Sequence, residues 1–270
     1  MAMNSEKKYV ESVDEFLTEL YQYIGEKEER DISHFFRGHA NEGWELLPSV
    51  FRNANLSHEE NLFYQSSSLL TEEFSSDMTT FDKLVKMQHY GLPTRLLDVT
   101  NNPLMALFFA CCDDNSKDKD ASVLCFRTKS HNVKNYDSDC VTMLSNLAKC
   151  EETTSRWELV HQIKQERDFE EDRIQEEHWN CYFFVNPKRN NERIKAQSGA
   201  FIIVGGVCHT PEIIKKRVIR HNINELSKQF YIHKEDKVKI LRQLDFLGIN
   251  KGSLYCDMEY KFERIKKSIN

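Results

Sequence analysis

The feature that most constrains the fold is an unbroken apolar run at residues 104–110, with the sequence Leu-Met-Ala-Leu-Phe-Phe-Ala. Asn102 and Pro103 stand directly before it. This pair is typical of a helix start, because asparagine caps free backbone N–H groups and proline fits the first helical turn. A helix that is apolar on every side has to be buried. The rest of the chain must therefore supply elements that enclose this helix.

Composition limits the classes of protein that the chain can belong to. Its 270 residues are 40% hydrophobic and 30% charged, the balance of a folded protein with a well-solvated surface. A net charge of -6 gives no general attraction to nucleic acid or to an anionic membrane. No apolar run approaches the roughly 18 residues that cross a bilayer, and no apolar signal segment follows Met1. We therefore expect a cytoplasmic protein without a membrane partner.

The cysteines point to no metal site. All eight lie outside Cys-x-x-Cys pairs and show no spacing typical of zinc ligands. Free cysteine is among the residues most often buried. We expect reduced thiols in the core and no bound metal.

Helix and strand patterns alternate irregularly along the chain. Helices are predicted at residues 12–24, 58–74, 81–90, 102–110, 140–149, 156–179, 234–246 and 258–267, and a further helix is predicted within the segment 187–197. Strands are predicted at residues 32–37, with a turn at Gly38, and at 122–127, 181–185, 200–207 and 218–223. This order favours an α+β fold in a single domain, residues 1–270 with a core of about 10–255, in which a small mixed or antiparallel sheet is flanked by helices.

Polar functional groups are unusually dense in what we predict to be a loop before the buried helix. They are Gln88, His89, Thr94, Arg95, Asp98 and Thr100. A buried helix needs its first N–H groups satisfied, and Asp98, Thr100 or Asn102 could do so. Capping does not account for Gln88, His89 and Arg95 together, since arginine is rarely buried unless it is paired. A binding or catalytic site is therefore predicted here.

Two blocks of the sequence resemble the FRG domain family, which is named for a Phe-Arg-Gly tripeptide. The first block holds Phe36-Arg37-Gly38, Trp44, the segment 46–49 and Arg52; the second runs from Gln-His-Tyr-Gly-Leu-Pro-Thr-Arg-Leu-Leu-Asp at 88–98 through the apolar helix to residue 110. Fainter similarity occurs at residues 193–201 and 247–257. Val99 stands where the family often has tryptophan. The resemblance implies family membership and does not by itself imply an activity.

The strand end at Arg37 and Gly38 also resembles the opening motif of the arginine-class ADP-ribosyltransferases. That resemblance implies that Arg37 anchors a ribose or phosphate of NAD, because arginine donates two parallel hydrogen bonds to phosphate oxygens, and that the Gly38 backbone binds the nicotinamide amide. Asp98 would stabilise the developing oxocarbenium ion, and His89 would act as acid or base. Gln197 stands where that fold normally has a catalytic glutamate, so glycohydrolase activity or simple binding stays open beside transfer.

Three interpretations of the site follow. The first is an NAD-consuming enzyme with Arg37, His89, Asp98 and Gln197 as catalytic residues, a protein or nucleic acid as a possible acceptor, and a role as a bacterial defence or toxin effector. The second is a non-catalytic module in which Arg37, Arg95 and Arg193 bind a nucleotide, another phosphorylated ligand or a nucleic-acid end. The third is a salt bridge of Arg37 or Arg95 with Asp98 that only fixes the loop. In the first two, the ligand contacts are expected from Gly38, Gln88, Thr94, Arg95, Thr100 and Arg193.

Overall fold

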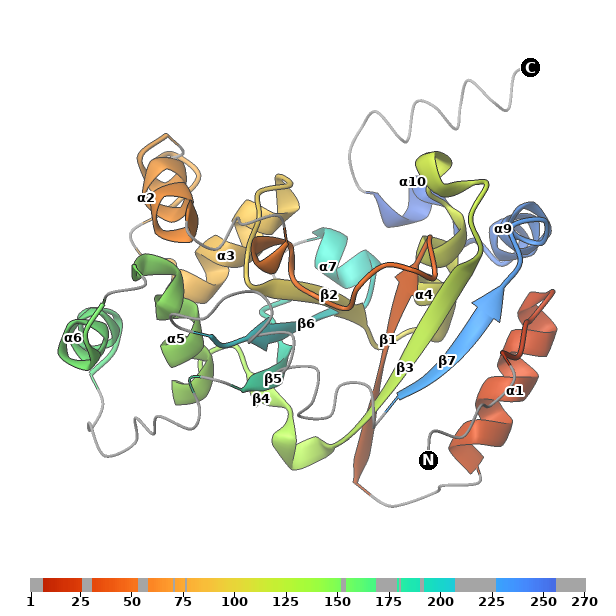
Figure 1. Ribbon diagram of the computed structural model, residues 1–270, viewed down its shortest axis with the longest axis horizontal. Helices are drawn as coiled ribbons and strands as arrows, with labels where there is room; N and C mark the ends of the chain where they lie inside the picture. Colours follow the sequence, from red (N-terminus) through yellow and green to blue (C-terminus); the bar gives the residue numbers. More distant parts are fainter. Residues whose placement is uncertain are drawn as a thin grey trace.

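The computed structural model describes residues 7–25, 31–52, 58–69, 71–75, 77–151, 154–168, 179, 181–189, 192–206 and 227–255. These residues form a seven-stranded sheet with helices packed on it (Figure 1). In order across the sheet the strands are β4 (Lys134–Asn135), β5 (Tyr182–Asn186), β6 (Gly199–Val204), β2 (Leu96–Thr100), β1 (Ile32–His39), β3 (Ala121–Lys129) and β7 (Ser227–Ile232). Neighbouring strands are antiparallel except for β4 and β5. The predicted α+β fold is confirmed.

The helices form two groups over the two halves of the sheet (Figure 1). The group that packs with β1, β3 and β7 contains α1 (Val13–Gly25), α4 (Pro103–Cys111), α9 (Lys237–Phe246) and α10 (Lys251–Leu254). The group that packs with β2, β5 and β6 contains α2 (Glu59–Leu69), α3 (Thr80–His89), α5 (Asp139–Asn146) and α6 (Arg156–Glu166). The short helix α7 (Glu192–Ala196) lies between the groups. Single 3-10 turns, η1 (Ser49–Phe51), η3 (Asp114–Ser116), η4 (Ser130–Asn132) and η5 (Leu147–Lys149), complete the described elements.

Alternation along the strands divides the core into layers. On β6, Phe201 and Ile203 join the apolar cluster beneath α3 and α5, whereas Ala200 and Ile202 face a third cluster on the opposite side of the sheet. The segment around η1 closes that third cluster with Phe51. Both faces of the central strands are therefore covered, and they form a rigid base for the side chains at their ends.

The buried helix predicted at residues 102–110 is α4, and it begins as predicted. The Asn102 side chain accepts a backbone N–H of the first turn over 2.9 Å. Strand β1 packs tightly against this helix at Gly38, where a Cβ would lie 2.1 Å from the carbonyl oxygen of Ala106 and 2.5 Å from the amide nitrogen of Ala110. Only glycine fits this contact. The turn predicted at Gly38 is wrong, because β1 continues to His39 in order to pack against α4.

Strands β1 and β2 separate soon after they meet. They share one residue pair, Phe36 with Thr100, whereas β1 pairs with β3 along its whole length. Beyond Phe36 the Arg37 side chain takes over the contact, because its Nη1 donates to the Asp98 carbonyl oxygen over 2.6 Å. The middle of the sheet therefore opens at the residues that the sequence singled out.

Three strands were not predicted: the two-residue strand β4, β2 and β7. β2 lies within the predicted loop at 88–102, because the polar Asp98 interrupts its short apolar pattern. β7 is an edge strand with polar residues, and it follows a predicted strand at 218–223 that lies outside the described residues. The helix predicted at 58–74 is shorter and ends at Leu69.

Some predictions concern parts of the chain that the structure does not describe. These are the helix at 258–267, residues 169–178 of the helix predicted at 156–179, and the thiols of Cys208 and Cys256. The helix predicted at 156–179 is also too long, because α6 ends at Glu166. The other six cysteines are free thiols. Within the described residues, no helix combines the length and the apolar character needed to span a bilayer.

Candidate functional site

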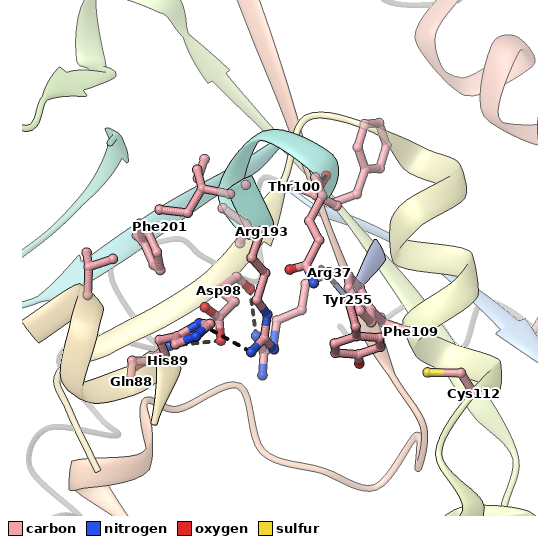
Figure 2. Close-up of a pocket in the computed structure, with 18 of the residues that line it drawn as sticks. Arg37, Gln88, His89, Asp98, Thr100, Phe109, Cys112, Arg193, Phe201 and Tyr255 are labelled. Atoms are coloured by element: carbon pink, nitrogen blue, oxygen red, sulfur yellow. Dashed lines mark hydrogen bonds between the residues drawn. The ribbon is translucent and has the colours of Figure 1, made fainter. Parts of the chain in front are cut away.

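A cavity of about 340 Å³ opens where β1 and β2 separate (Figure 2). Its walls come from both strands, the ends of α3 and α4, the α7 region and Tyr255. Small-molecule sites commonly have volumes of roughly 300–1,000 Å³. The predicted site residues that line the cavity are Arg37, Gly38, Gln88, His89, Asp98, Thr100, Arg193 and Gln197. Thr94 and Arg95 are not in its lining.

Arg37 bridges the two strands at the cavity. Its Nη1 donates to the Asp98 carbonyl oxygen over 2.6 Å, and its Nε donates to His39 Nε2 over 3.1 Å. Burial lowers the pKa of Arg37 to about 10, although Asp98 acts in the opposite direction. The guanidinium is therefore charged at neutral pH. Because it has five N–H groups and two of them are engaged in these bonds, donors remain for an anionic ligand.

His39 is the partner that holds the Arg37 side chain. It follows Arg37 by two residues and so lies on the same side of β1. Its side chain is 1% exposed and meets the Trp44 ring edge-on. Burial, together with the charges of Arg37 and Arg52, lowers the pKa of His39 to about 3. The ring is neutral at pH 7, so Arg37 is held without being neutralised.

Asp98 presents its carboxylate to the same cavity. It is exposed, whereas Leu97 and Val99 on either side of it in β2 are buried. Gln88 Nε2 donates to Asp98 Oδ2 over 2.8 Å, and the Thr94 hydroxyl donates in turn to Gln88 Oε1. Thr94 is fully buried. Thr94 therefore lies behind the cavity wall, where its hydroxyl holds Gln88.

Arg193 brings a second guanidinium to the cavity from α7. Its Nη1 lies 3.4 Å from Nδ1 of His89, at the end of α3 (Figure 2). The guanidinium also lies over the Tyr255 ring, 5.2 Å from its centroid. Such a cation–aromatic contact favours the charged group without neutralising it. Positive charge from two distant parts of the sequence therefore converges on one space.

Thr100 and Gln197 line the cavity, and their polar groups form hydrogen bonds with the backbone of the segments around it. Thr100 Oγ1 donates to the Gln197 carbonyl oxygen over 2.7 Å and accepts the Asn102 N–H over 3.0 Å. Gln197 Nε2 donates to the Leu254 carbonyl oxygen over 3.2 Å. These bonds connect the end of β2 to the turn after α7, and that turn to the end of α10.

Arg95, which was predicted to bind ligand, is buried away from the cavity. Its side chain is 1% exposed and forms a two-pronged ion pair with Glu59 of α2, in which Nε lies 2.9 Å from Oε1 and Nη2 also donates to Oε2. Nη1 donates to the Val204 carbonyl oxygen over 3.2 Å. Arg95 therefore pairs with Glu59 and not with Asp98, and it is not part of the cavity lining. This partner could not be predicted from local patterns, because Glu59 belongs to a helix that is distant along the chain.

Several residues of the cavity wall were not assigned to the site from the sequence. Phe109 supplies aromatic surface, and Cys112 is also in the lining. Trp44, for which a place in the cavity and a place in the core were equally open from the sequence, lines the cavity as well. Burial raises the pKa of the Cys112 thiol to about 11, so it stays protonated and weakly nucleophilic. Asp113 accepts hydrogen bonds from the Asn115 N–H and the Ser116 hydroxyl, which satisfy both of its oxygens. Helical spacing at the end of α4 was the available signal for Phe109 and Cys112.

A group of metal-ligand type lies elsewhere in the described residues. Asp120, His233 and Glu235 each offer one atom, and these atoms lie within 4.8 Å of one another. Asp120 Oδ1 already accepts the Lys234 N–H over 3.0 Å, and Tyr9 stacks on the His233 ring. None of these residues lines the cavity.

The fold and the cavity define a class: an α+β protein with an arginine- and carboxylate-lined cavity at the opening of its central sheet. Residues 33–119 match the family model of the FRG domain. The chain therefore contains an FRG domain match over these residues. The matched part contributes Arg37, Gly38 and the whole segment from Gln88 to α4, whereas Arg193, Gln197 and Tyr255 come from later in the chain. Searches of curated proteins and of solved structures returned no match.

Proposed function

We propose that the cavity binds NAD and cleaves its nicotinamide–ribose bond, in the manner of an ADP-ribosyltransferase or an NAD glycohydrolase. One observation carries the proposal: the charged Arg37 and the carboxylate of Asp98, from neighbouring strands, face one cavity of about 340 Å³. A dinucleotide carries anionic phosphates and ribose hydroxyls, which match a guanidinium and a carboxylate respectively.

The walls suit the other parts of such a ligand. Arg37 and Arg193 both offer donors to phosphate oxygens, and Arg is well suited to phosphate recognition because its donors form a planar fork. Phe109 and Trp44 give apolar surface for a planar ring. A nucleotide therefore finds a charged centre and an aromatic wall in the same space.

Cleavage of the nicotinamide–ribose bond depends mainly on a negative charge near the ribose and a group that accepts a proton. When the glycosidic bond breaks, nicotinamide leaves with the bonding electron pair as a neutral molecule, and positive charge develops on the ribose. The Asp98 carboxylate stabilises that charge. Water or an acceptor hydroxyl then attacks the ribose carbon, and His89 accepts the proton that is released. A protein or nucleic acid as acceptor gives ADP-ribosyl transfer, and water as acceptor gives NAD hydrolysis.

A second candidate function is non-catalytic binding of a nucleotide or another phosphorylated ligand. The observation that favours it is the engagement of the Gln197 amide, which donates to the Leu254 carbonyl oxygen and carries no charge. Such a module needs the converging guanidinium groups and has no need of Asp98. Replacing Asp98 therefore separates the two candidates.

The deciding experiment incubates the protein with NAD and measures both nicotinamide release and NAD binding by calorimetry. We expect wild type to release nicotinamide. Arg37→Met should weaken NAD binding by about tenfold or more, because a charge-assisted hydrogen bond contributes about 1.5–3 kcal/mol. Asp98→Asn should still bind NAD but release nicotinamide at least a hundredfold more slowly. Binding without release in wild type supports the module. Absence of both binding and release removes the NAD proposal.

A defence or toxin role follows from the enzyme proposal alone. An enzyme of this kind lowers the cellular NAD pool when it is expressed in bacteria. We expect cells expressing wild type to lose NAD and stop growing, whereas cells expressing Arg37→Met at the same level keep both. Equal NAD levels in the two cultures would argue against this role.

A further inference from the structure

We infer that Thr94 and Gln88 form a positioning pair, whose purpose is to fix the Asp98 carboxylate for the reaction, and that neither is a catalytic residue. The inference deepens the proposed function and rests on it where catalysis is concerned. It is carried by a directed chain of hydrogen bonds that runs from the backbone of β2, through both side chains, to the carboxylate.

The chain of hydrogen bonds begins at a backbone N–H group. Thr94 Oγ1 accepts the Leu96 N–H over 3.2 Å, so its own proton is free to point elsewhere. That proton is donated to Gln88 Oε1. The Thr94 backbone is itself fixed, because its N–H donates to Ser49 Oγ over 3.1 Å and its carbonyl oxygen accepts the Val50 N–H over 3.2 Å. Thr94 is therefore a rigid, fully buried anchor.

The Thr94 hydroxyl determines which way the Gln88 amide points. An amide side chain can present either its oxygen or its NH₂ group, and the hydrogen-bond network decides between them. Because the hydroxyl donates to Oε1, Gln88 must present Nε2 to Asp98, and this atom lies 2.8 Å from Oδ2. Reversing the amide would place its oxygen against a carboxylate oxygen, which is repulsive. One orientation is therefore strongly favoured.

Asp98 is then held from two sides. Gln88 holds Oδ2, and Arg37 holds the backbone carbonyl of the same residue. Among the described residues, no side chain donates to Oδ1, which is left for the ligand in the cavity. Catalytic groups need to be held to within a fraction of an ångström, and supporting hydrogen bonds provide that restraint. We therefore expect this chain of hydrogen bonds to affect kcat more than the affinity for the ligand.

The test compares Thr94→Val, Thr94→Ser and Gln88→Glu, with Thr128→Val as a control in a buried threonine of β3 outside the cavity lining. For nicotinamide release, Thr94→Val lowers kcat about tenfold, the equivalent of one neutral hydrogen bond, while the KM for NAD stays within about twofold. Thr94→Ser restores the hydroxyl and kcat, and Thr128→Val leaves kcat unchanged. Gln88→Glu lowers kcat at pH 7 and partly regains it at pH 5, because a proton shared between the two carboxyls restores the hydrogen bond.

A measurement without NAD separates this inference from the proposed function. The side-chain NH₂ resonances of Gln88, followed by nuclear magnetic resonance, shift and exchange faster with water in Thr94→Val but not in Thr94→Ser. If wild type releases no nicotinamide, the proposed function fails and these resonances alone decide the positioning. Unchanged Gln88 resonances in Thr94→Val, or a kcat equal to that of wild type, would overturn the inference.

Discussion

Two arginines on either side of the sheet opening show how one residue type can serve structure or binding. Arg95, just before β2, is 1% exposed and pairs with the Glu59 carboxylate, which neutralises its charge. Arg37, on β1, donates to a carbonyl oxygen and to the neutral ring of His39. Arg95 is therefore held by a charge, whereas Arg37 is held by dipoles.

The difference teaches where to look for ligand-binding charge. A buried ion pair satisfies both partners and leaves little charge for a ligand. A guanidinium that is oriented by neutral acceptors keeps its full charge and stays in place. The choice of partner, Glu59 or His39, decides between the two outcomes.

The largest expected effect is a loss of stability when the ion pair between Arg95 and Glu59 is broken. Arg95→Met leaves Glu59 buried without its partner and lowers the free energy of unfolding by about 3–5 kcal/mol. Arg37→Met, the matched control, changes it by less than about 1 kcal/mol, because water replaces the lost partners at the cavity. The measurement is urea denaturation followed by circular dichroism. The double variant Glu59→Leu with Arg95→Met should recover most of the loss. Equal losses in Arg95→Met and Arg37→Met would contradict the comparison.

The second prediction tests the neutral partner through pH. The pKa of His39 falls from 6.5 in the unfolded chain to about 3 in the folded protein, so the unfolded state binds more protons below pH 6.5. Stability is therefore lost as the pH falls from 6.5 toward 3, at about 1.4 kcal/mol per pH unit for this group. Between pH 6.5 and pH 5 the loss is about 2 kcal/mol.

The variant His39→Gln keeps an acceptor for Arg37 but cannot take up a proton. Its free energy of unfolding should therefore fall less than that of wild type over the same interval, when both are measured by denaturation at several pH values. If the free energy of unfolding depends on pH in the same way in both proteins, folding does not lower the pKa of His39, and this prediction is wrong.

The smallest effect concerns Arg193, whose guanidinium lies over the Tyr255 ring. The variant Tyr255→Leu removes the ring beneath its guanidinium, a contact of about 0.5–1 kcal/mol. NAD affinity measured by calorimetry should weaken about two- to fivefold. The matched variant Tyr255→Phe keeps the ring and should bind within about twofold of wild type. A larger loss for Tyr255→Phe than for Tyr255→Leu would assign the effect to the hydroxyl.

Much of the fold follows from local patterns in the sequence. The capped helix at residues 102–110 and the glycine that ends α3 were readable, because capping and a positive φ are properties of single residues. β2 was not, since a short strand with a polar centre looks like a loop until its neighbours are known. The central position of β2 between β1 and β6 is a property of the whole sheet.

The site divides in the same way. The sequence alone determined that Arg37, His89, Asp98 and the segment around them carry more polar chemistry than capping requires, because residue type and density are local properties. Only the tertiary structure decided that Arg95 pairs with Glu59, that Thr94 supports Gln88, and that Arg193 and Tyr255 complete the cavity. Each of these depends on contacts between segments far apart in the chain. Whether a side chain is buried, and whether its charge is neutralised, depends on the partner that the fold brings next to it.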